Sequence, residues 1–349
     1  MREALIDPSP YVVRAYVAAM GRNREAEDVS VLLDLLREAA KGSAELPVTS
    51  VKSTLVRSRV SDLDQFVPFL NDEDPRFRFV LVDSIRQVCD EAKFGLNAGD
   101  FPDGLYQWFV NKAPRDASID VRARSAGVIR HFHDTAATET LCRLMGDKSE
   151  FVRMHAVRAC ADPYYFDLIP DVIWGITDTS WRVREASVKT LGKFGRSGRI
   201  NLAQYFLDTE DQFACEQIIE GMQRNGIITE MLPALSGEDA ESMLAMRVCF
   251  KMVRMGKTSL LVDLLKKEIL LSRWAPPATT GGSTIAAAEK ARAQLLELLL
   301  RAPTEDLMIA LQTVAERKGD HLRAAAQAAL ESLQPAAFAG EESQCTISL

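Results

Sequence analysis

Apolar and polar positions recur with a period of 31 residues in the middle of the chain. The register aligns three Asp and, six positions further on, three Arg: Asp116, Asp147 and Asp178, then Arg122, Arg153 and Arg184. A Val precedes each Arg, and small or apolar residues follow it at spacings of three and four, which is the period of one helix face. Self-similarity of this kind predicts that one structural unit is built repeatedly.

The segments before each aligned Asp have a helical pattern too. They read LYQWFVNKA, ATETLCRLM and LIPDVIWGI, each with apolar residues spaced three to four apart. One unit is therefore predicted to be a helix, a short turn that holds the Asp, and a second helix that opens with Val-Arg. Because two amphipathic helices of this length cannot enclose a core alone, neighbouring units must stack, and this predicts an all-α solenoid.

The pattern of Asp, four further residues, Val-Arg and a closing Leu-Gly resembles HEAT repeats, especially the short bacterial class similar to phycobilin-lyase-type HEAT repeats. The residues closest to this pattern are Asp178, Val183, Arg184, Ala186, Leu191 and Gly192. The resemblance is specific over residues 110–200, moderate over 1–110 and weak after 210. It implies a right-handed α-α superhelix of about 9–10 helical pairs.

Two segments nearer the N-terminus fit the pattern with substitutions. In residues 7–21 the Arg comes one place late, and in residues 72–85 Phe77 and Arg78 occupy the Val-Arg positions. A degenerate repeat is expected between them, with its second helix near residues 48–58. Since the first Asp leaves no room for a preceding helix, either the array begins with a single capping helix or the chain continues something longer. An exposed apolar edge is expected there.

The pattern also predicts how the chain is organised. The HEAT-repeat solenoid is expected over residues 1–272, and the Pro-, Gly- and Thr-rich stretch APPATTGGST marks a flexible loop at 273–284. Residues 285–334 read as a helical cap of the same solenoid, and residues 335–349 as a disordered tail.

The repeated Asp and Arg are interpreted as structural. An Asp in a turn can accept backbone N–H groups at the start of the next helix, where the helix dipole also favours a carboxylate. In proteins with similar repeats the Arg commonly reaches the Asp of a neighbouring unit. The resemblance therefore implies an inter-repeat ladder made by Asp116, Arg122, Asp147, Arg153, Asp178 and Arg184.

The charge and the cysteine content indicate which kinds of partner and which cell compartment suit the protein. The formal net charge of -7 argues against an overall polyanion-binding surface. Locally, however, residues 112–199 carry 15 Lys and Arg against 11 Asp and Glu, whereas residues 200–250 carry 2 against 9. The 6 Cys contain no CxxC pair, and neither a secretory signal nor a run of 18 apolar residues is present. These features predict a cytoplasmic protein that is not inserted in a membrane.

The sequence matches none of the common catalytic or metal-binding motifs in full. MGKTSLL lacks the Gly that a phosphate loop needs five residues before Gly256, and the two His of HFHD do not share a helical face. The sequence contains no HExxH, GxSxG or GxGxxG. No catalytic, cofactor-binding or metal-binding residue is predicted, and the protein is expected not to be an enzyme.

The candidate partner-binding residues are basic or aromatic: Arg158, Lys189, Trp181, Arg182, Tyr164 and Tyr165. Arg158 and Lys189 share a register position with Gly127, and in related solenoids this position tends toward the concave side. The two cations therefore form either a solvated face or a row that binds a partner. Trp181 lies in a turn, where it is either packed over the neighbouring unit or exposed as an anchor.

The sequence is compatible with three functions. The first is a non-enzymatic scaffold that binds another protein on the solenoid surface. The second is nucleic-acid binding or base-repair chemistry, as in bacterial glycosylases built from similar HEAT-like helices, and nucleic acid is the less favoured partner because the chain is acidic overall. The third, suggested only by the repeat type, is a chromophore lyase or chaperone.

Overall fold

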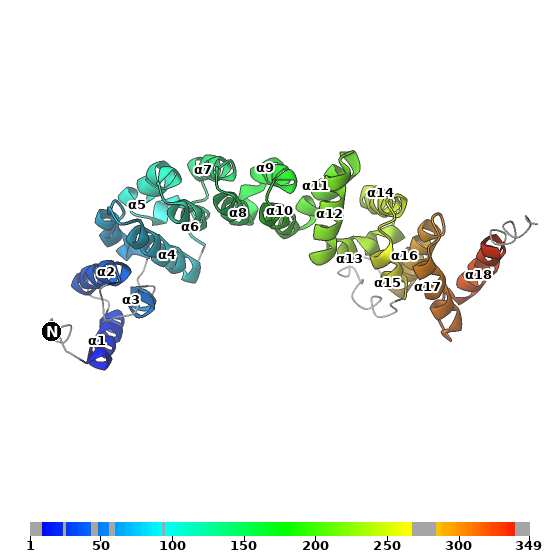
Figure 1. Ribbon diagram of the computed structural model, residues 1–349, viewed down its shortest axis with the longest axis horizontal. Coiled ribbons are helices and arrows are strands. Elements are labelled where there is room, and N and C mark those ends of the chain that lie inside the picture. Colours follow the sequence, from blue (N-terminus) through cyan, green and yellow to red (C-terminus); the bar gives the residue numbers. More distant parts are fainter. Residues whose placement is uncertain are drawn as a thin grey trace, which may run out of the picture. The chain divides into compact units, whose positions relative to one another are not determined.

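The computed structural model describes residues 9–23, 26–42, 48–55, 60–92, 95–266 and 284–338 (Figure 1). In these residues every regular element is a helix, so the all-α prediction is confirmed. The chain divides into two compact units, Met1–Phe194 (unit 1) and Gly195–Leu349 (unit 2). The sequence analysis placed no boundary at this point.

The described residues of unit 1 form ten α-helices: α1 Pro10–Asn23, α2 Ala26–Ala40, α3 Val48–Leu55, α4 Pro75–Glu91, α5 Asp103–Gln107, α6 Ile119–Ile129, α7 Thr135–Met145, α8 Glu150–Ala159, α9 Ile169–Trp174 and α10 Trp181–Lys193. Short 3-10 segments join them: η2 Val60–Phe69, η3 Ala98–Asp100, η5 Ala113–Arg115, η6 Pro163–Leu168 and η7 Gly175–Thr177. One π-helical turn, η4 Trp108–Lys112, follows α5.

Unit 2 contains α11 Gly195–Asp208, α12 Gln212–Arg224, α13 Ile227–Met231, the 3-10 helix η8 Leu232–Ser236, α14 Ala240–Arg254, α15 Ser259–Lys266, α16 Thr284–Leu299, α17 Glu305–Glu316 and α18 Arg323–Phe338. The predicted flexible loop at 273–284 lies outside the described residues except for Thr284, which begins α16. α18 continues to Phe338, into the predicted tail, and residues 339–349 lie outside the described part of the chain.

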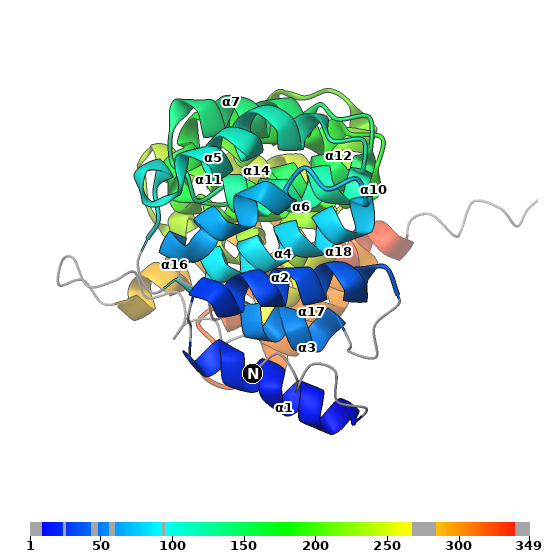
Figure 2. The ribbon, with the colours of Figure 1, turned by 90° about the vertical axis from the view of Figure 1, so that its left-hand side faces the viewer.

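The second helices of successive repeats pack side by side in unit 1. α4 contacts α6, α6 contacts α8, and α8 contacts α10. α7 and α9 form the other layer over α6, α8 and α10 (Figure 1), and Figure 2 shows α2 and α4 continuing the stack toward the N-terminus. The buried side chains between these layers include Val121, Val152 and Val183, which are the Val of the repeated Val-Arg pair.

Small side chains allow the helices of unit 1 to approach closely. Ser125 and Ser187 are fully buried, and each hydroxyl donates to the carbonyl four residues earlier, so no polar group is left unsatisfied. At Gly175 an added Cβ would lie 2.2 Å from the Ser187 Oγ, because η7 passes directly against α10. The small positions in the repeat pattern therefore set the spacing between layers.

The first helices of the repeats are less regular than the sequence predicted. LYQWFVNKA forms α5, the π-helical η4 and the start of η5, and LIPDVIWGI forms α9 and part of η7. Pro114 contributes to the first of these breaks, since it has no N–H to donate to the preceding turn. The degenerate repeat does contain a helix, α3, within the expected residues 48–58.

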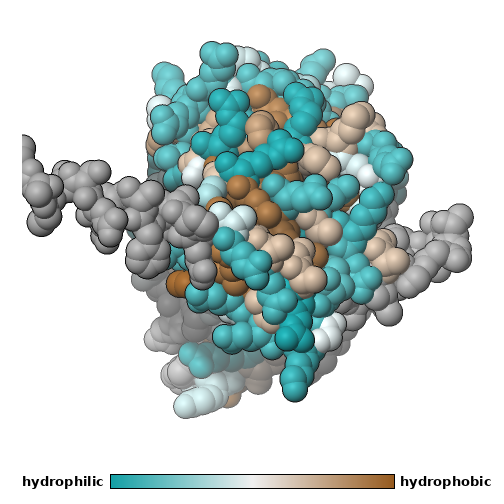
Figure 3. Space-filling view, turned by 90° about the vertical axis from the view of Figure 1, so that its right-hand side faces the viewer, coloured by the Kyte–Doolittle hydropathy of each residue, from teal (hydrophilic) through white to brown (hydrophobic). Residues whose placement is uncertain are grey.

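Exposed apolar side chains occur at both ends of the described chain. At the N-terminal side, α1 exposes Tyr11 and Val12, which lie where an apolar edge was expected. In unit 2 the view toward α17 and α18 shows apolar side chains in the middle of a hydrophilic surface (Figure 3), and Ile309 of α17 is exposed.

Candidate functional site

The repeated Arg and Asp form a ladder of bidentate ion pairs through unit 1. Arg122 Nε and Nη2 donate to the two carboxylate oxygens of Asp147 over 2.8 and 3.0 Å. Arg153 binds Asp178 in the same way over 2.7 and 2.8 Å. Each Arg therefore reaches the Asp of the following repeat, as the family resemblance implies.

Backbone hydrogen bonds fix both partners of the ladder. Asp147 Oδ1 accepts the N–H of Ser149, the N-cap residue of α8, over 2.8 Å. Arg153 Nη1 donates to the carbonyl of Asp147, in its own repeat, over 2.9 Å. Burial alone would raise the pKa of Asp147, but the hydrogen bonds from Arg122 and the Ser149 N–H outweigh it and lower that pKa. The ladder is thus a joint between stacked units.

The joint extends further toward the N-terminus than the predicted residues. Arg78 of α4 donates to Asp116 over 2.9 and 2.8 Å, and Arg37 of α2 lies 2.6 Å from Asp72. At the other end, Arg184 Nη1 donates to the carbonyl of Asp178 over 2.7 Å. Arg–Asp pairs thus recur from Arg37 of α2 to Asp178, just before α10.

A basic pocket lies on the second helices α4, α6 and α8. Its volume is about 180 Å³, and it is lined by Arg86, Asp90, Arg124, Gly127, Arg130, His155, Arg158 and Ala159. Of the predicted site residues, only Arg158 belongs to it. A signal in the sequence could have found two others, because Arg86 and Arg130 both follow a ladder Arg by eight residues.

Two Asp hold most of the cations around this pocket, called the arginine pocket below. Asp83 Oδ1 lies 3.1 Å from Arg86 Nε and 3.2 Å from Arg124 Nε, and Asp83 also pairs with Lys52. Asp90 Oδ1 lies 2.6 Å from Arg130 Nη2 and 3.1 Å from His131 Nε2, and Asp90 also pairs with Arg86. The pKa values of both Asp are lowered, because these cations outweigh the effect of burial.

Gly127 makes the arginine pocket possible. An added Cβ at this position would lie 2.7 Å from Arg86 Cδ, so Arg86 of α4 lies across the backbone of α6. Gly127 shares the register position of Arg158 and Lys189, and in α4 the same position is Asp83. This one register position is thus Asp83 on α4, Gly127 on α6 and Arg158 on α8. The Gly leaves room for Arg86, and Arg158 adds a further cation to the pocket.

His155 lies between the arginines of the pocket. Burial and the positive charges of Arg124, Arg158 and Arg86 lower its pKa to about 4. Its ring packs edge-on against Phe151, with the ring centroids 4.6 Å apart. At neutral pH this imidazole is therefore uncharged, and the positive charge of the pocket comes from the guanidinium groups alone.

A second candidate surface surrounds the turn between α9 and α10. Trp181 is the first residue of α10 and is 58% exposed, so it does not pack over the neighbouring unit. Arg182 lies over its ring at 5.7 Å from the centroid and is 3.9 Å from Glu150. Trp174, the last residue of α9, is 77% exposed. Sequence reasoning missed Trp174 because its position in an apolar helical pattern suggested burial.

The predicted aromatic residues of the ADPYYFD segment do not join this surface. Tyr165 is buried, and its hydroxyl donates to the carbonyls of Ile129 and Arg130 over 3.1 Å, so the prediction that it contacts a partner is wrong. Tyr164 is exposed and packs on His133, with the ring centroids 5.0 Å apart.

The segment is also far from Trp181. Phe166, two residues after Tyr164, packs on Phe194 just beyond the last residue of α10, whereas Trp181 begins that helix. Because α10 has 13 residues, its ends are ~20 Å apart. The structure therefore separates Tyr164 from Trp181 and Arg182, while Arg158 and Lys189 are exposed on the second helices.

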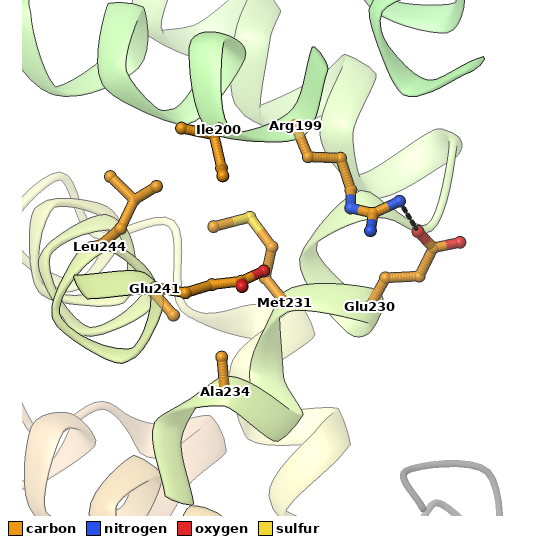
Figure 4. Close-up of a pocket in the computed structure, with 8 residues that line it drawn as sticks. Arg199, Ile200, Glu230, Met231, Ala234, Glu241 and Leu244 are labelled. Atoms are coloured by element: carbon orange, nitrogen blue, oxygen red, sulfur yellow. Dashed lines mark hydrogen bonds and ion pairs between the residues drawn. The ribbon is translucent and has the colours of Figure 1, made fainter. Parts of the chain in front are cut away.

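Unit 2 has a small pocket between α11, α13, η8 and α14 (Figure 4). Its volume is only about 10 Å³, which is room for a single water. Arg199 at its rim turns toward Glu230, and the two side chains are 3.1 Å apart. Elsewhere in this unit Arg292 and Asp320 form a buried pair with Nη2–Oδ2 at 3.0 Å, and Arg292 also donates to the Leu265 carbonyl over 2.8 Å. Both arrangements hold the fold together.

The described residues show neither a metal-binding cluster nor a membrane-spanning helix. No group of three or more His, Cys, Asp or Glu there is placed to hold a metal ion. None of the helices in the described ranges is long and apolar enough to cross a membrane. Burial raises the pKa of the Cys89 and Cys249 thiols to about 12, so these side chains pack as small hydrophobes.

Residues 106–165 match the family model of HEAT repeats. This range holds the ladder residues Asp116, Arg122, Asp147 and Arg153 and much of the arginine pocket. The further resemblance to phycobilin-lyase-type repeats is not part of this match and stays a prediction.

Comparisons with whole chains give more distant similarities. One similar structure is an engineered protein solved by the Northeast Structural Genomics Consortium, with 13% identity, a TM-score of 0.36, and 95% of this chain and 97% of that chain covered. Another is a chain of the Pds5–Scc1 complex, described for its implications for cohesin function, with 13% identity and a TM-score of 0.44. That alignment covers 91% of this chain and 56% of the other. No curated protein matches the sequence.

Proposed function

Residues 106–165 of this chain are HEAT repeats, and from that premise we propose that the protein is a non-enzymatic scaffold that binds another protein on the surface of unit 1. Stacked repeats suit this role because they offer an extended surface without requiring an enclosed pocket. The proposal needs no cofactor and no chemical step.

The exposed tryptophans of the α9–α10 turn carry the proposal. Trp174 and Trp181 are 77% and 58% exposed, and Arg182 lies over Trp181. Large aromatic side chains that face solvent together with Arg are typical of the residues that dominate binding energy in interfaces. A partner that covers this turn would remove both indole rings from water.

The test is affinity capture with chemical cross-linking from a lysate of the source organism. The full chain is compared with a Trp174→Ala/Trp181→Ala double variant and with Phe213→Ala, which removes a comparably exposed aromatic side chain from unit 2. We expect one partner protein to be cross-linked to unit 1 of the wild type and of the Phe213 variant, and to be lost from the double variant. Absence of any specific partner on the wild type would contradict the scaffold function.

A second candidate function is binding to nucleic acid, which the arginine pocket favours. Four guanidinium groups from three helices face one pocket, and such a cluster attracts phosphate groups. The measurement is retention on duplex DNA as a function of salt concentration. Retention at low salt that falls steeply with added salt would favour this function, and no retention at low salt would exclude it.

A further inference from the structure

The arginine pocket contains more positive charge than its acidic residues neutralise. Arg86, Arg124, Arg130 and Arg158 line it together with one carboxylate, that of Asp90. Arg86 and Arg130 are engaged by Asp90, and Arg124 uses Nε on Asp83. Arg158 is exposed and makes no ion pair with any described residue. Arg124 and Arg158 thus line the pocket with guanidinium groups that, apart from Arg124 Nε on Asp83, have no carboxylate partner among the described residues.

The cations continue beyond the pocket as a row across the helices. Arg86 lies on α4, Arg124 on α6, Arg158 on α8 and Lys189 on α10, and these helices pack in this order. Neighbouring packed helices have axes ~10 Å apart, and a peptide in the polyproline II conformation advances ~3.1 Å per residue with three residues per turn, so that every third side chain points to the same side. A peptide that crosses the helices would thus place every third residue opposite a new cation.

The row matches a sparsely charged polyanion better than a nucleic acid. Duplex DNA carries one negative charge for every ~1.7 Å of its axis, so it would present several phosphates for each helix crossed. Carboxylates spaced along a peptide meet one guanidinium or ammonium group each, and Arg binds a carboxylate with paired donors.

We propose that the arginine pocket and Lys189 form the docking site for an extended acidic segment of the partner protein, with Asp or Glu at every third residue. Arg124, Arg158 and Lys189, which lie on the successive second helices α6, α8 and α10, hold one carboxylate each. His155 lines the same pocket. This inference rests on the proposed scaffold function and names the chemistry of the partner.

The test uses the full chain and a fluorescein-labelled synthetic peptide of about twelve residues, long enough at ~3.1 Å per residue in the polyproline II conformation to cross the row. The peptide has Glu at every third position, with Gly and Ser between. A matched peptide carries Gln in place of Glu. Binding is measured by fluorescence anisotropy for the wild type, for Arg158→Glu and for Arg143→Glu. Arg143 is exposed on α7, in the other helix layer, so this variant makes the same charge change away from the row.

We expect the wild type to bind the Glu peptide, with affinity falling as salt is added, and not to bind the Gln peptide. Arg158→Glu should weaken binding at least tenfold and Arg143→Glu at most twofold, with both variants unfolding at the wild-type temperature. Lys189→Gln serves as a second, milder variant and should weaken binding several-fold. Equal binding by Arg158→Glu and the wild type, equal binding of the Gln peptide, or no binding of the Glu peptide would overturn the proposal.

Two further outcomes separate this inference from the proposed function. If unlabelled duplex DNA displaces the peptide at a lower concentration than the unlabelled peptide does, and Arg158→Glu abolishes DNA binding, the row is a nucleic-acid site and the acidic-segment proposal is overturned. If the partner captured by the wild type is captured equally by Arg158→Glu, the scaffold function stands and this docking site is overturned.

Discussion

Single residues of the repeat carry more than one interaction each. Asp147 accepts two hydrogen bonds from Arg122 and one from the Ser149 N–H, and its carbonyl accepts a fourth from Arg153. The sequence register identified this Asp and this Arg as structural before any contact was known. This was possible because the same contact between neighbouring repeats occurs several times, so the same residue types stand at the same spacing.

Asp147→Asn should lower the free energy of unfolding by about 1–3 kcal/mol, because it leaves the guanidinium of Arg122 in a half-buried site without its counter-charge. The measurement is urea denaturation followed by circular dichroism. Asp167→Asn is the matched control, since Asp167 is exposed and outside the ladder. Equal stability of the two variants would contradict the structural role of the ladder.

His155 should titrate far below an ordinary histidine, with a pKa of about 4. Its pKa in the folded protein lies below the value of ~6.5 in the unfolded chain, so the unfolded state takes up the proton first. Stability is therefore expected to fall as the pH decreases from ~6.5 to about 4. NMR titration of the imidazole gives the pKa directly, and Arg158→Ala should raise it. A pKa near the ordinary value would contradict the clustering of Arg124, Arg158 and Arg86 around this ring.

At the scale of elements, the helix pairs depend on close approach between layers. The sequence predicted the helices correctly, yet it did not predict that the first helices of two repeats break into α, π and 3-10 segments. Periodicity specifies which side of a helix is apolar, but the position of a break depends on how the segment fits the helix beneath it. Gly175, where η7 passes over Ser187 of α10, is such a position.

Gly175→Ala should destabilise unit 1 by about 1–3 kcal/mol, because the new Cβ would collide with the Ser187 hydroxyl. The double variant Gly175→Ala/Ser187→Ala should recover most of this loss, since the next contact, with Ser187 Cβ, is 3.4 Å away and ordinary. A double-mutant cycle of thermal unfolding measures the coupling. If the two effects simply add, the close approach of η7 and α10 is not the cause.

For the whole molecule, the division at 194/195 is the main feature that the sequence analysis did not place. Phe194 closes unit 1 by packing on Phe166, and Gly195, with φ of 64°, takes the left-handed conformation that glycine adopts readily. The resemblance to HEAT repeats becomes weak after residue 210, some residues beyond this division, but a weaker sequence pattern does not say whether the helices continue as one compact body.

Residues 1–194 should fold when produced alone, because they form a compact unit whose ladder pairs join residues of that unit. We expect a helical circular dichroism spectrum, cooperative thermal unfolding, and binding of the Glu peptide as tight as that of the full chain. A fragment that is unfolded or aggregates would show that the two units depend on each other for stability.

The sequence by itself determined the all-α repeat architecture and the Asp and Arg of the ladder. Repeated units need the same apolar helix face and the same paired charges, so these residue types recur at a fixed spacing. Only the tertiary structure decided which of the candidate side chains are exposed and which are buried. Arg86 reaches the arginine pocket over Gly127 from another helix, Tyr165 is buried by hydrogen bonds to residues 35 and 36 positions earlier, and Trp174 is left in solvent. Each of these outcomes depends on the neighbouring repeat, whose position in space no local pattern specifies.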